Sequence, residues 1–243
     1  MFLKVNSSRK KESRLNHRFL AIESASKTCS VALFEGSKLI DQLEEGGDYS
    51  HAEKLAPFVD QLLKKNDLKP NDLSAIGISS GPGSYTGLRI GLSLAKGLAV
   101  GSQLPLIAIP TLDGMSWGAR NSKKDEHALY CPMLDARRME VYTALYKYDG
   151  SQIVSTEAKV IDENSFQEEL AKHKIYFFGD GAAKCADTID SPNAIFLDVS
   201  HISARNFGEL IAQKFASEEF EDLAYFEPNY FKDFRAGQPK KLL

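Results

Sequence analysis

The stretch with the clearest chemical signature is the glycine-rich run "SSGPGSYTGLRIGLSLAKGLAVGSQLP" at residues 79–105, which holds six of the chain's 17 glycines. A glycine turn between a strand and a helix can bind phosphate through backbone N–H groups. The run lacks both the lysine of a GxxxxGK[ST] loop and the spacing of GxGxxG. Two interpretations remain: a looser phosphate cradle, and a tight turn at Gly81–Gly83 with Ser84 as helix cap, which we favour.

The helix that follows carries a ridge of small residues. Gly87, Gly91, Ala95 and Ala99 recur every four residues, with Leu88 and Leu92 beside them. A helix that is apolar on nearly all sides must be buried on nearly all sides. The pattern fits a core helix and a docking face for another chain equally well.

Three other segments could contact a phosphate or a purine. "ESASKTCS" places polar side chains after the first strand but lacks glycine, and "FFGDGAA" is a strand–turn–helix junction of the kind that approaches nucleotides. "DARRMEVY" is a hairpin corner at which we predict an Asp–Arg pair. The candidate residues are Glu23, Ser24, Thr28, Asp135, Gly179, Asp180 and Gly181.

Signatures of a metal centre or a catalytic nucleophile are missing from the sequence. The five histidines show no HxxxH or HExxH spacing, no GxSxG occurs, and Cys29, Cys131 and Cys185 form no CxxC pair. We therefore predict no catalytic residue, no metal and a reducing, cytoplasmic environment.

Charge is unevenly distributed along the 243 residues. Residues 1–18 carry six Lys or Arg and one Glu, a net charge of +5. Because the whole chain has a net charge of −3, residues 19–243 together carry −8. Such an acidic body is a poor binder of nucleic acid by itself. The basic N-terminus lacks the apolar segment of a signal peptide, no apolar run is long enough for a bilayer, and we predict a disordered extension over 1–18.

The order of elements repeats once. Three strands within 19–45, a helix at 51–66, a strand at 73–81, the helix at 84–101 and a strand at 105–111 are matched after residue 128. The second set has strands within 128–161, helices at 162–173, 182–189 and 203–215, and strands at 174–181 and 194–199. This order predicts an α/β fold of two lobes with mixed sheets flanked by helices, at 19–110 and 111–234, and a disordered tail at 235–243.

Several segments together resemble the TsaB (YeaZ-like) family. They are "LAIESASKTCSVAL", "SHAEKLAPFVDQLL", "DARRMEVYTALY", "EPNYFKDF" and, most specifically, "GPGSYTGLRIG". The resemblance runs from about Phe19 to about Phe234 and implies the actin/Hsp70-like (ASKHA) ATPase fold, with two ribonuclease-H-like lobes.

The resemblance also implies a function. Members support the catalytic paralogue TsaD, together with the ATPase TsaE and the synthase TsaC, in placing threonylcarbamoyl on the adenosine next to the tRNA anticodon. TsaD holds its metal through HxxxH after the strand that matches "PLIAIPT"; this chain has "TLDGMSWGA" there. We therefore expect a non-catalytic subunit that reaches tRNA only through the complex, forms a homodimer when alone and has no membrane contact.

The resemblance places partner binding on the helices at 51–66 and 84–101. The predicted partner-binding residues are His51, Leu55, Phe58, Val59, Leu62, Tyr85, Leu88, Gly91, Leu92, Ala95 and Ala99. Fold relatives commonly have Asp and Gly in the first phosphate loop where this chain has Glu23 and Ala25. We thus expect at most weak ATP or ADP binding. The alternatives are an independent ATP-binding enzyme and a glycoprotease-like hydrolase, which would need a nucleophile–base pair or a metal.

Overall fold

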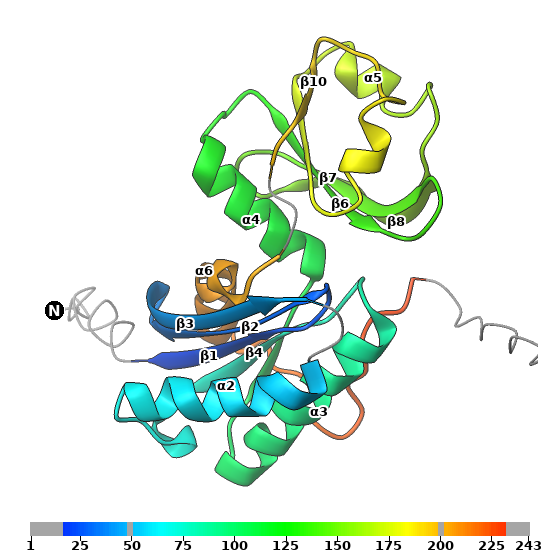
Figure 1. The fold of residues 1–243 in the computed structure, drawn as a ribbon. Coiled ribbons are helices and arrows are strands. Elements are labelled where there is room, and N and C mark those ends of the chain that lie inside the picture. Colours follow the sequence, from blue (N-terminus) through cyan, green and yellow to red (C-terminus); the bar gives the residue numbers. More distant parts are fainter. Residues whose placement is uncertain (1–16, 48–50, 199–201, 232–243) are drawn as a thin grey trace, which may run out of the picture.

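The structure is a computed structural model that describes residues 17–47, 51–198 and 202–231. It contains two five-stranded sheets, one above the other in Figure 1, with helices on their faces. The expectations for the chain ends at 1–16 and 235–243 lie outside the described residues. His17 and Arg18 are described, and Arg18 already belongs to the first strand.

The first sheet has the strand order β3-β2-β1-β4-β5. Its strands are β1 (Arg18–Glu23), β2 (Thr28–Glu35), β3 (Lys38–Gly46), β4 (Ala75–Ser79) and β5 (Leu106–Ile109). The first three form antiparallel hairpins, while β4 and β5 run parallel to β1. The carboxyl ends of β1, β4 and β5 therefore meet at one edge.

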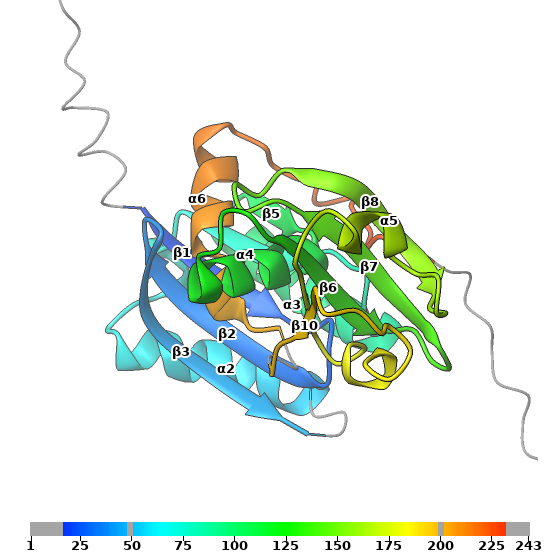
Figure 2. The ribbon, with the colours of Figure 1, turned by 90° about the horizontal axis from the view of Figure 1, so that it is seen from above.

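The second sheet repeats this order as β8-β7-β6-β9-β10. Its strands are β6 (Leu129–Asp135), β7 (Glu140–Tyr146), β8 (Gln152–Val160), β9 (Ile175–Phe178) and β10 (Ala194–Phe196). The two sheets are seen in projection in Figure 2. The duplication is thus confirmed at the level of topology, and the fold is the predicted ASKHA-like pair of ribonuclease-H-like lobes.

Two long helices, α2 (His51–Lys65) and α3 (Tyr85–Ser102), cover one face of the first sheet (Figure 1). Alternate residues of β1 and β2, such as Ile22 and Val31, point into this layer and pack with Leu55, Leu62 and Ala95. Strand periodicity and helix periodicity thus meet in one apolar core.

The other face of the first sheet meets the second lobe through α4 (Thr111–Lys123) and α6 (Gly208–Ala216). Phe34 of the first sheet, Met115 of α4, Phe178 of the second sheet and Phe207 belong to one continuous buried cluster. No helix was predicted at 111–123, so α4 is an element that the sequence pattern did not reveal. The lobes therefore share a core instead of being joined by a linker alone.

The second lobe has much shorter helices than predicted. The helix expected at 162–173 is the single turn α5 (Gln167–Leu170), and that expected at 182–189 is the 3-10 turn η2 (Ala183–Cys185). Asp162 accepts hydrogen bonds from the Asn164 N–H and the Ser165 hydroxyl, and Phe166 has a left-handed φ of 63°. Such side-chain-to-backbone bonds compete with helix formation.

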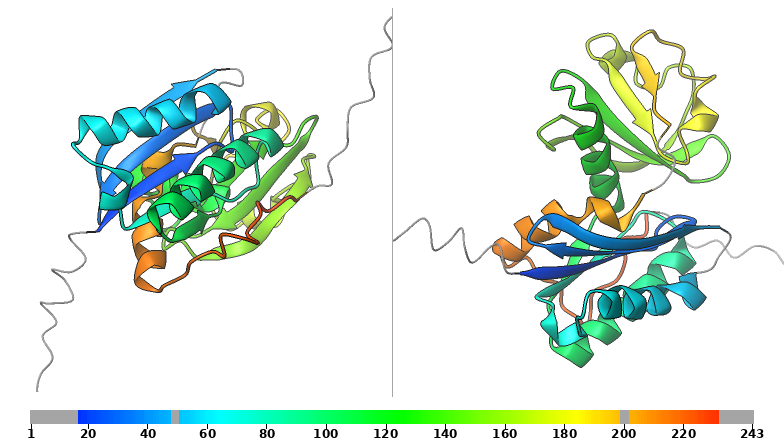
Figure 3. Two further views of the ribbon diagram at one scale, coloured as in Figure 1. Left: turned by 90° about the horizontal axis from the view of Figure 1, so that it is seen from below. Right: turned by 60° about the vertical axis from the view of Figure 1, so that its left-hand side comes forward.

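After Ile202 the chain returns to the first lobe. The helix expected at 203–215 is divided into η3 (Ala204–Asn206) and α6, and both pack on the first sheet. Residues 217–231, here called the strap, follow α6 back past α3 (Figure 3). The Glu221 N–H donates to the Leu106 carbonyl at 2.9 Å, so the strap covers the open edge at β5. Residues 203–231 thus contact the first sheet, although we assigned them to the second lobe.

In the part of the chain that the structure describes, no helix combines the length and the apolar character needed to cross a bilayer.

Candidate functional site

The glycine turn at the start of α3 is closed by the protein's own groups. Ser84 Oγ accepts from the Gly87 N–H at 3.2 Å, and the Ser84 N–H donates to the Ala25 carbonyl at 2.7 Å. The Leu88 N–H donates to the Ser84 carbonyl at 2.8 Å. Because these N–H groups are engaged, the capped-turn interpretation is confirmed and the turn does not present them to a phosphate.

Close packing of the β1–β2 loop on α3 explains the glycine spacing. A Cβ at Gly83 would lie 2.4 Å from the Ala25 carbonyl oxygen, and one at Gly87 would lie 2.1 Å from the Ser24 carbonyl oxygen. At Gly91 the added Cβ would be 2.1 Å from Ser24 Oγ. The glycines are therefore needed for contact with the chain itself.

Nearly all of the predicted partner-binding residues are buried within the first lobe. The buried ones are His51, Leu55, Val59, Leu62, Leu88, Gly91, Leu92, Ala95 and Ala99. Phe58 and Tyr85 are partly exposed. The small-residue ridge is therefore a core face and not a docking face. Periodicity reveals an apolar stripe but does not tell whether the same chain covers it.

A different surface of the two helices is apolar and faces outward. Val100 is 66% exposed, Gly97 and Gly101 are exposed, and Leu94 and Leu98 are partly exposed. On α2, the exposed residues Ala52 and Ala56 share a flank with Val59 and Leu63. We call the set Ala52, Ala56, Ile90, Leu94, Gly97, Leu98 and Val100 the outer helix surface.

Ion pairs orient α2 and place this flank toward α3. Lys65 pairs with Asp41 at 2.8 Å and Lys54 pairs with Glu45, so the opposite flank of α2 lies along β3. The repeat of Ile90, Leu94 and Leu98 was visible in the sequence. We based the partner-binding prediction on the glycine and alanine repeat instead of on this one.

Glu23, at the carboxyl end of β1, is fully buried. Its Oε1 accepts from the Ala25 N–H at 2.5 Å, while Oε2 has no hydrogen-bond partner among the described residues. Burial raises the pKa of Glu23 to about 7, and the hydrogen bond from the Ala25 N–H lowers it only in part. The carboxyl group therefore titrates near neutral pH, well above the usual pKa range of a glutamate.

Ser24 and Thr28 lie in the same loop but do not extend this site. The Ser24 N–H donates to Ser79 Oγ at 3.3 Å, and its hydroxyl faces α3 at Gly91. Thr28 is the first residue of β2, and its N–H donates to Ser26 Oγ at 3.2 Å. The loop is held by its own side chains.

Asp135, at the carboxyl end of β6, is exposed and ion-paired with Lys184. It also accepts from the Arg137 N–H at 3.0 Å, and its own N–H donates to Asp180 at 2.9 Å. Partial burial opposes ionisation, but these bonds and the Lys184 charge hold the pKa of Asp135 below its usual value. The predicted Asp–Arg turn pair is thus present through the Arg137 backbone N–H, while the ion-pair partner of the carboxylate is Lys184.

The β9 turn closes against β6 as well. The Gly181 N–H donates to the Met133 carbonyl at 3.0 Å, and Gly179 has a left-handed φ of 109°. Lys27 of the β1–β2 loop acts electrostatically on both Asp135 and Asp180. The structure thus brings Asp135, Gly179, Asp180 and Gly181 together, and Glu23 and Ser24 form a separate group in the other lobe.

The region where the resemblance suggests a metal in TsaD does not fit one here. It is the start of α4, where the stretch 111–119 holds no histidine and its one acid, Asp113, accepts from the Tyr146 hydroxyl at 2.7 Å. Met115 is buried in the core between the lobes, with its methyl group against Gly179. Across the described residues no three His, Cys, Asp or Glu side chains come together. A single carboxylate that is already engaged by a tyrosine hydroxyl is a poor donor set for a catalytic divalent ion.

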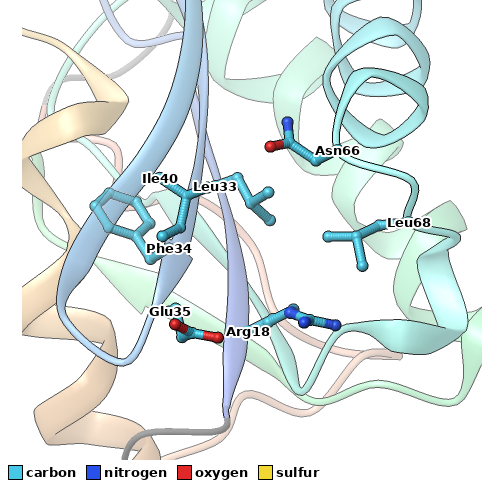
Figure 4. A pocket seen from close by; sticks show the side chains of 7 residues that line it. All are labelled: Arg18, Leu33, Phe34, Glu35, Ile40, Asn66 and Leu68. Carbon is cyan, nitrogen blue, oxygen red and sulfur yellow. The ribbon is translucent and has the colours of Figure 1, made fainter.

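Two hollows lie away from these strand ends. One, of about 130 Å³, is at the opposite end of the first sheet (Figure 4). It is lined by Arg18, Leu33, Phe34, Glu35, Ile40, Asn66 and Leu68. The other, of about 440 Å³, is an open hollow beside α5. The first is smaller than the roughly 300 Å³ of ordinary ligand pockets.

Comparison with known sequences identifies related proteins. The family model described as "TsaD: tRNA N6-adenosine threonylcarbamoyltransferase" matches residues 47–242. The protein named tRNA threonylcarbamoyladenosine biosynthesis protein TsaB from Bacillus subtilis is 37% identical over 145 residues, 60% of each chain. Its namesake from Escherichia coli is 37% identical over 136 residues, 56% of this chain and 58% of that one. The chain thus matches about 60% of the length of these relatives.

Solved structures extend the similarity over most of the fold. YeaZ from Pseudomonas aeruginosa superposes with a TM-score of 0.76 at 25% identity, covering 88% of this chain and 99% of that one. A protein described as similar to peptidase YEAZ, from the same organism, gives a TM-score of 0.78 at 25% identity, with 89% and 100% covered. The chain therefore belongs to the family that the TsaD model describes and, within it, to the TsaB (YeaZ-like) group.

Proposed function

We propose that this protein is the non-catalytic subunit of tRNA threonylcarbamoyladenosine biosynthesis that binds and supports the catalytic paralogue TsaD. The names of its relatives supply the pathway. The outer helix surface is the observation that carries the proposal, because it is an apolar helix surface that the described chain leaves accessible.

The chemistry of this surface suits a helical partner. Exposed apolar groups such as Val100 mark association sites when they lie side by side with few charges. Gly97 and Gly101 let a second helix approach closely, as ridge-into-groove packing requires. A paralogue with the same fold would offer two equivalent helices, and a second copy of this chain would do so when the paralogue is absent.

The strand ends support a non-catalytic role. The N–H groups of Ser84, Gly87 and Leu88 at the start of α3 are engaged internally, and burial raises the pKa of Glu23 to about 7. Cys131 is buried beside the Thr143 hydroxyl at 3.1 Å, and burial raises the pKa of its thiol to about 12. A thiol of that pKa is protonated at neutral pH and is a poor nucleophile, which disfavours the hydrolase alternative.

The test is light scattering on the size-exclusion eluate of the full chain mixed with TsaD from the same organism. A mixed complex is expected, and tRNA modification reconstituted with TsaC, TsaE and TsaD should then require this chain. Two folded proteins that elute separately, with modification independent of this chain, would refute the proposal.

A further inference from the structure

The hairpin between β6 and β7 has two consecutive arginines in an unfavourable backbone conformation. Arg137 has a φ of 71° and Arg138 a φ of 53°. Side chains other than those of Gly, Asn and Asp are disfavoured in this left-handed region. Asn-Gly is the common solution for adjacent left-handed residues in a hairpin turn. Stability alone therefore does not account for two arginines here.

The two guanidinium groups are exposed and form no ion pair with any residue that the structure describes. Two of the acids beside them are already engaged, and a third, Glu140, lies two residues after Arg138 at the start of β7. Asp135 accepts from Lys184 and from the Arg137 backbone, and Asp180 accepts from the Asp135 N–H. In a chain with a net charge of −3, this turn still presents two adjacent, exposed arginine side chains.

An exposed aromatic ring lies close to the same hairpin. Phe231, at the end of the strap, is 40% exposed and its ring centroid is 6.2 Å from that of Tyr142. Tyr142 follows the first residue of β7 by two positions, which is about 7 Å along a strand. The sequence beyond Phe231 continues with Lys232, Arg235, Lys240 and Lys241 and a single acid, Asp233. The exposed ring of Phe231 and the two arginines therefore both border the start of β7.

We propose that Arg137, Arg138, Tyr142 and Phe231, here called the hairpin surface, contact RNA. Arginine binds phosphate oxygens in a bidentate manner, and unstacked bases of RNA loops stack on exposed aromatic rings. An acidic protein segment would satisfy the arginines but would leave the exposed ring of Phe231 without a role. The inference rests on the proposed function, in which RNA reaches this chain as the substrate of the complex. Arg137, Arg138 and Tyr142 belong to the second lobe and Phe231 ends the strap, whereas the outer helix surface lies on α2 and α3 of the first lobe, so RNA and a docked partner would use different surfaces.

The first test replaces the strained pair in the full chain by R137N/R138G. The complex with TsaD is titrated with an unmodified tRNA transcript at several salt concentrations. Loss of two phosphate contacts should make the negative slope of log K against log salt less steep, by about 1.4 to 1.8. The same change relieves the left-handed arginines and raises the melting temperature of the chain by about 2–4 °C. A merely structural role for the arginines would not weaken RNA binding while stabilising the fold.

The matched control is K147A/K172A, which removes two exposed positive charges from the same lobe. Lys147 lies in the turn at the far end of β7. This control should keep the wild-type salt slope. Phe231→Ala should weaken binding of the isolated anticodon stem-loop about fivefold or more, since a stacked base contributes this much. Phe231→Leu keeps the apolar contact but removes the stacking, and should behave like Phe231→Ala.

Equal affinity and equal slope for wild type, R137N/R138G and K147A/K172A would overturn the inference and leave the proposed function intact. Loss of TsaD binding in R137N/R138G would also overturn it, because the surface would then belong to a protein interface. Failure of the wild-type chain to form the complex would refute the proposed function itself, and with it the inference.

Discussion

The two lobes end their first strands with a carboxylate in the same position but in opposite surroundings. Glu23 at the end of β1 is fully buried, and burial raises its pKa to about 7. Asp135 at the end of β6 is exposed. The little desolvation that it undergoes opposes ionisation, but Lys184 and the Arg137 N–H outweigh it and lower the pKa of Asp135. One duplicated topology therefore provides a closed strand end in the first lobe and an open one in the second.

Helix length causes this difference. In the first lobe α3 has 18 residues and packs on the β1–β2 loop through Gly83, Gly87 and Gly91. The corresponding element of the second lobe, η2, has three residues and leaves the β6–β7 hairpin exposed. The strand order thus sets the frame, whereas the helices decide which strand end is available to a ligand.

The largest effect is expected where α3 contacts its own lobe. Ala95→Glu would bury a carboxylate at a position with no exposure, which costs several kcal/mol by analogy with other unpaired buried charges. We expect the first lobe to unfold, as measured by circular dichroism and urea titration. Gly91→Leu should act similarly because its side chain would overlap Ser24.

The control is Ser93→Glu, which adds the same charge to an exposed position of α3. It should leave the urea midpoint within the range of ordinary surface substitutions, about 0.5 kcal/mol. A folded Ala95→Glu protein with a wild-type midpoint would show that α3 is not the core helix described here.

The two carboxylates should give opposite pH dependences of stability. The folded state binds the Glu23 proton more tightly than the unfolded state, so the free energy of unfolding falls as pH rises from 4.5 through about 7. Glu23→Gln should therefore be more stable than wild type at pH 8.5, by on the order of 3 kcal/mol, and similar to it at pH 4.5. Urea unfolding at the two pH values measures this.

For Asp135 the lowered pKa means that its contribution is present above the unfolded value and is lost as pH falls through the folded value. Asp135→Asn should flatten the acid side of the profile and leave the alkaline side unchanged. If Glu23→Gln differed from wild type by the same amount at pH 4.5 and 8.5, Glu23 would not be the titrating group.

The next effect concerns binding through the outer helix surface. Leu94→Glu places a charge on its partly exposed apolar flank and should weaken the complex with TsaD about 30-fold, since an interface hot spot contributes about 2 kcal/mol. Gln167→Glu on α5 adds the same charge to the second lobe and should bind normally. Calorimetry or light scattering of the mixtures distinguishes them. Equal weakening by both variants would indicate a non-specific charge effect.

Much of the fold could be predicted because its signals are local. Alternating strands, the cap at Ser84 and the repeated order of elements follow from periodicity and turn chemistry. Helix α4 was missed because Gly114, Ser116 and Gly118 weaken its propensity, whereas in the structure glycine lets it pack against Phe207 and Asn206. This contact joins residues about 90 positions apart, which no local pattern reveals.

The site was predicted less well for a related reason. The ridge of Gly87, Gly91, Ala95 and Ala99 correctly indicates close packing, but its neighbours are the β1–β2 loop and the apolar core of the same lobe. The burial of Glu23 and the exposure of Asp135 also depend on which helix covers each strand end. The sequence pattern predicted a helix at the equivalent place in both lobes, at 84–101 and at 182–189, whereas the second is only a single 3-10 turn. Identical strand patterns therefore concealed different chemistry.

The smallest effect is expected from Mg-ATP. The Ser84, Gly87 and Leu88 N–H groups are all engaged, so the closed end in the first lobe has little to offer a phosphate. If the dissociation constant is about 1 mM or weaker, about 1 mM ATP stabilises the fold by at most about 0.4 kcal/mol, a shift of about 1 °C in melting temperature. A constant near 10 μM would instead give about 2.7 kcal/mol and a shift of several degrees. Repeating the titration with R137N/R138G locates any shift: one that disappears in this variant comes from the open end of the second lobe, whereas one that persists requires the first lobe to open at α3.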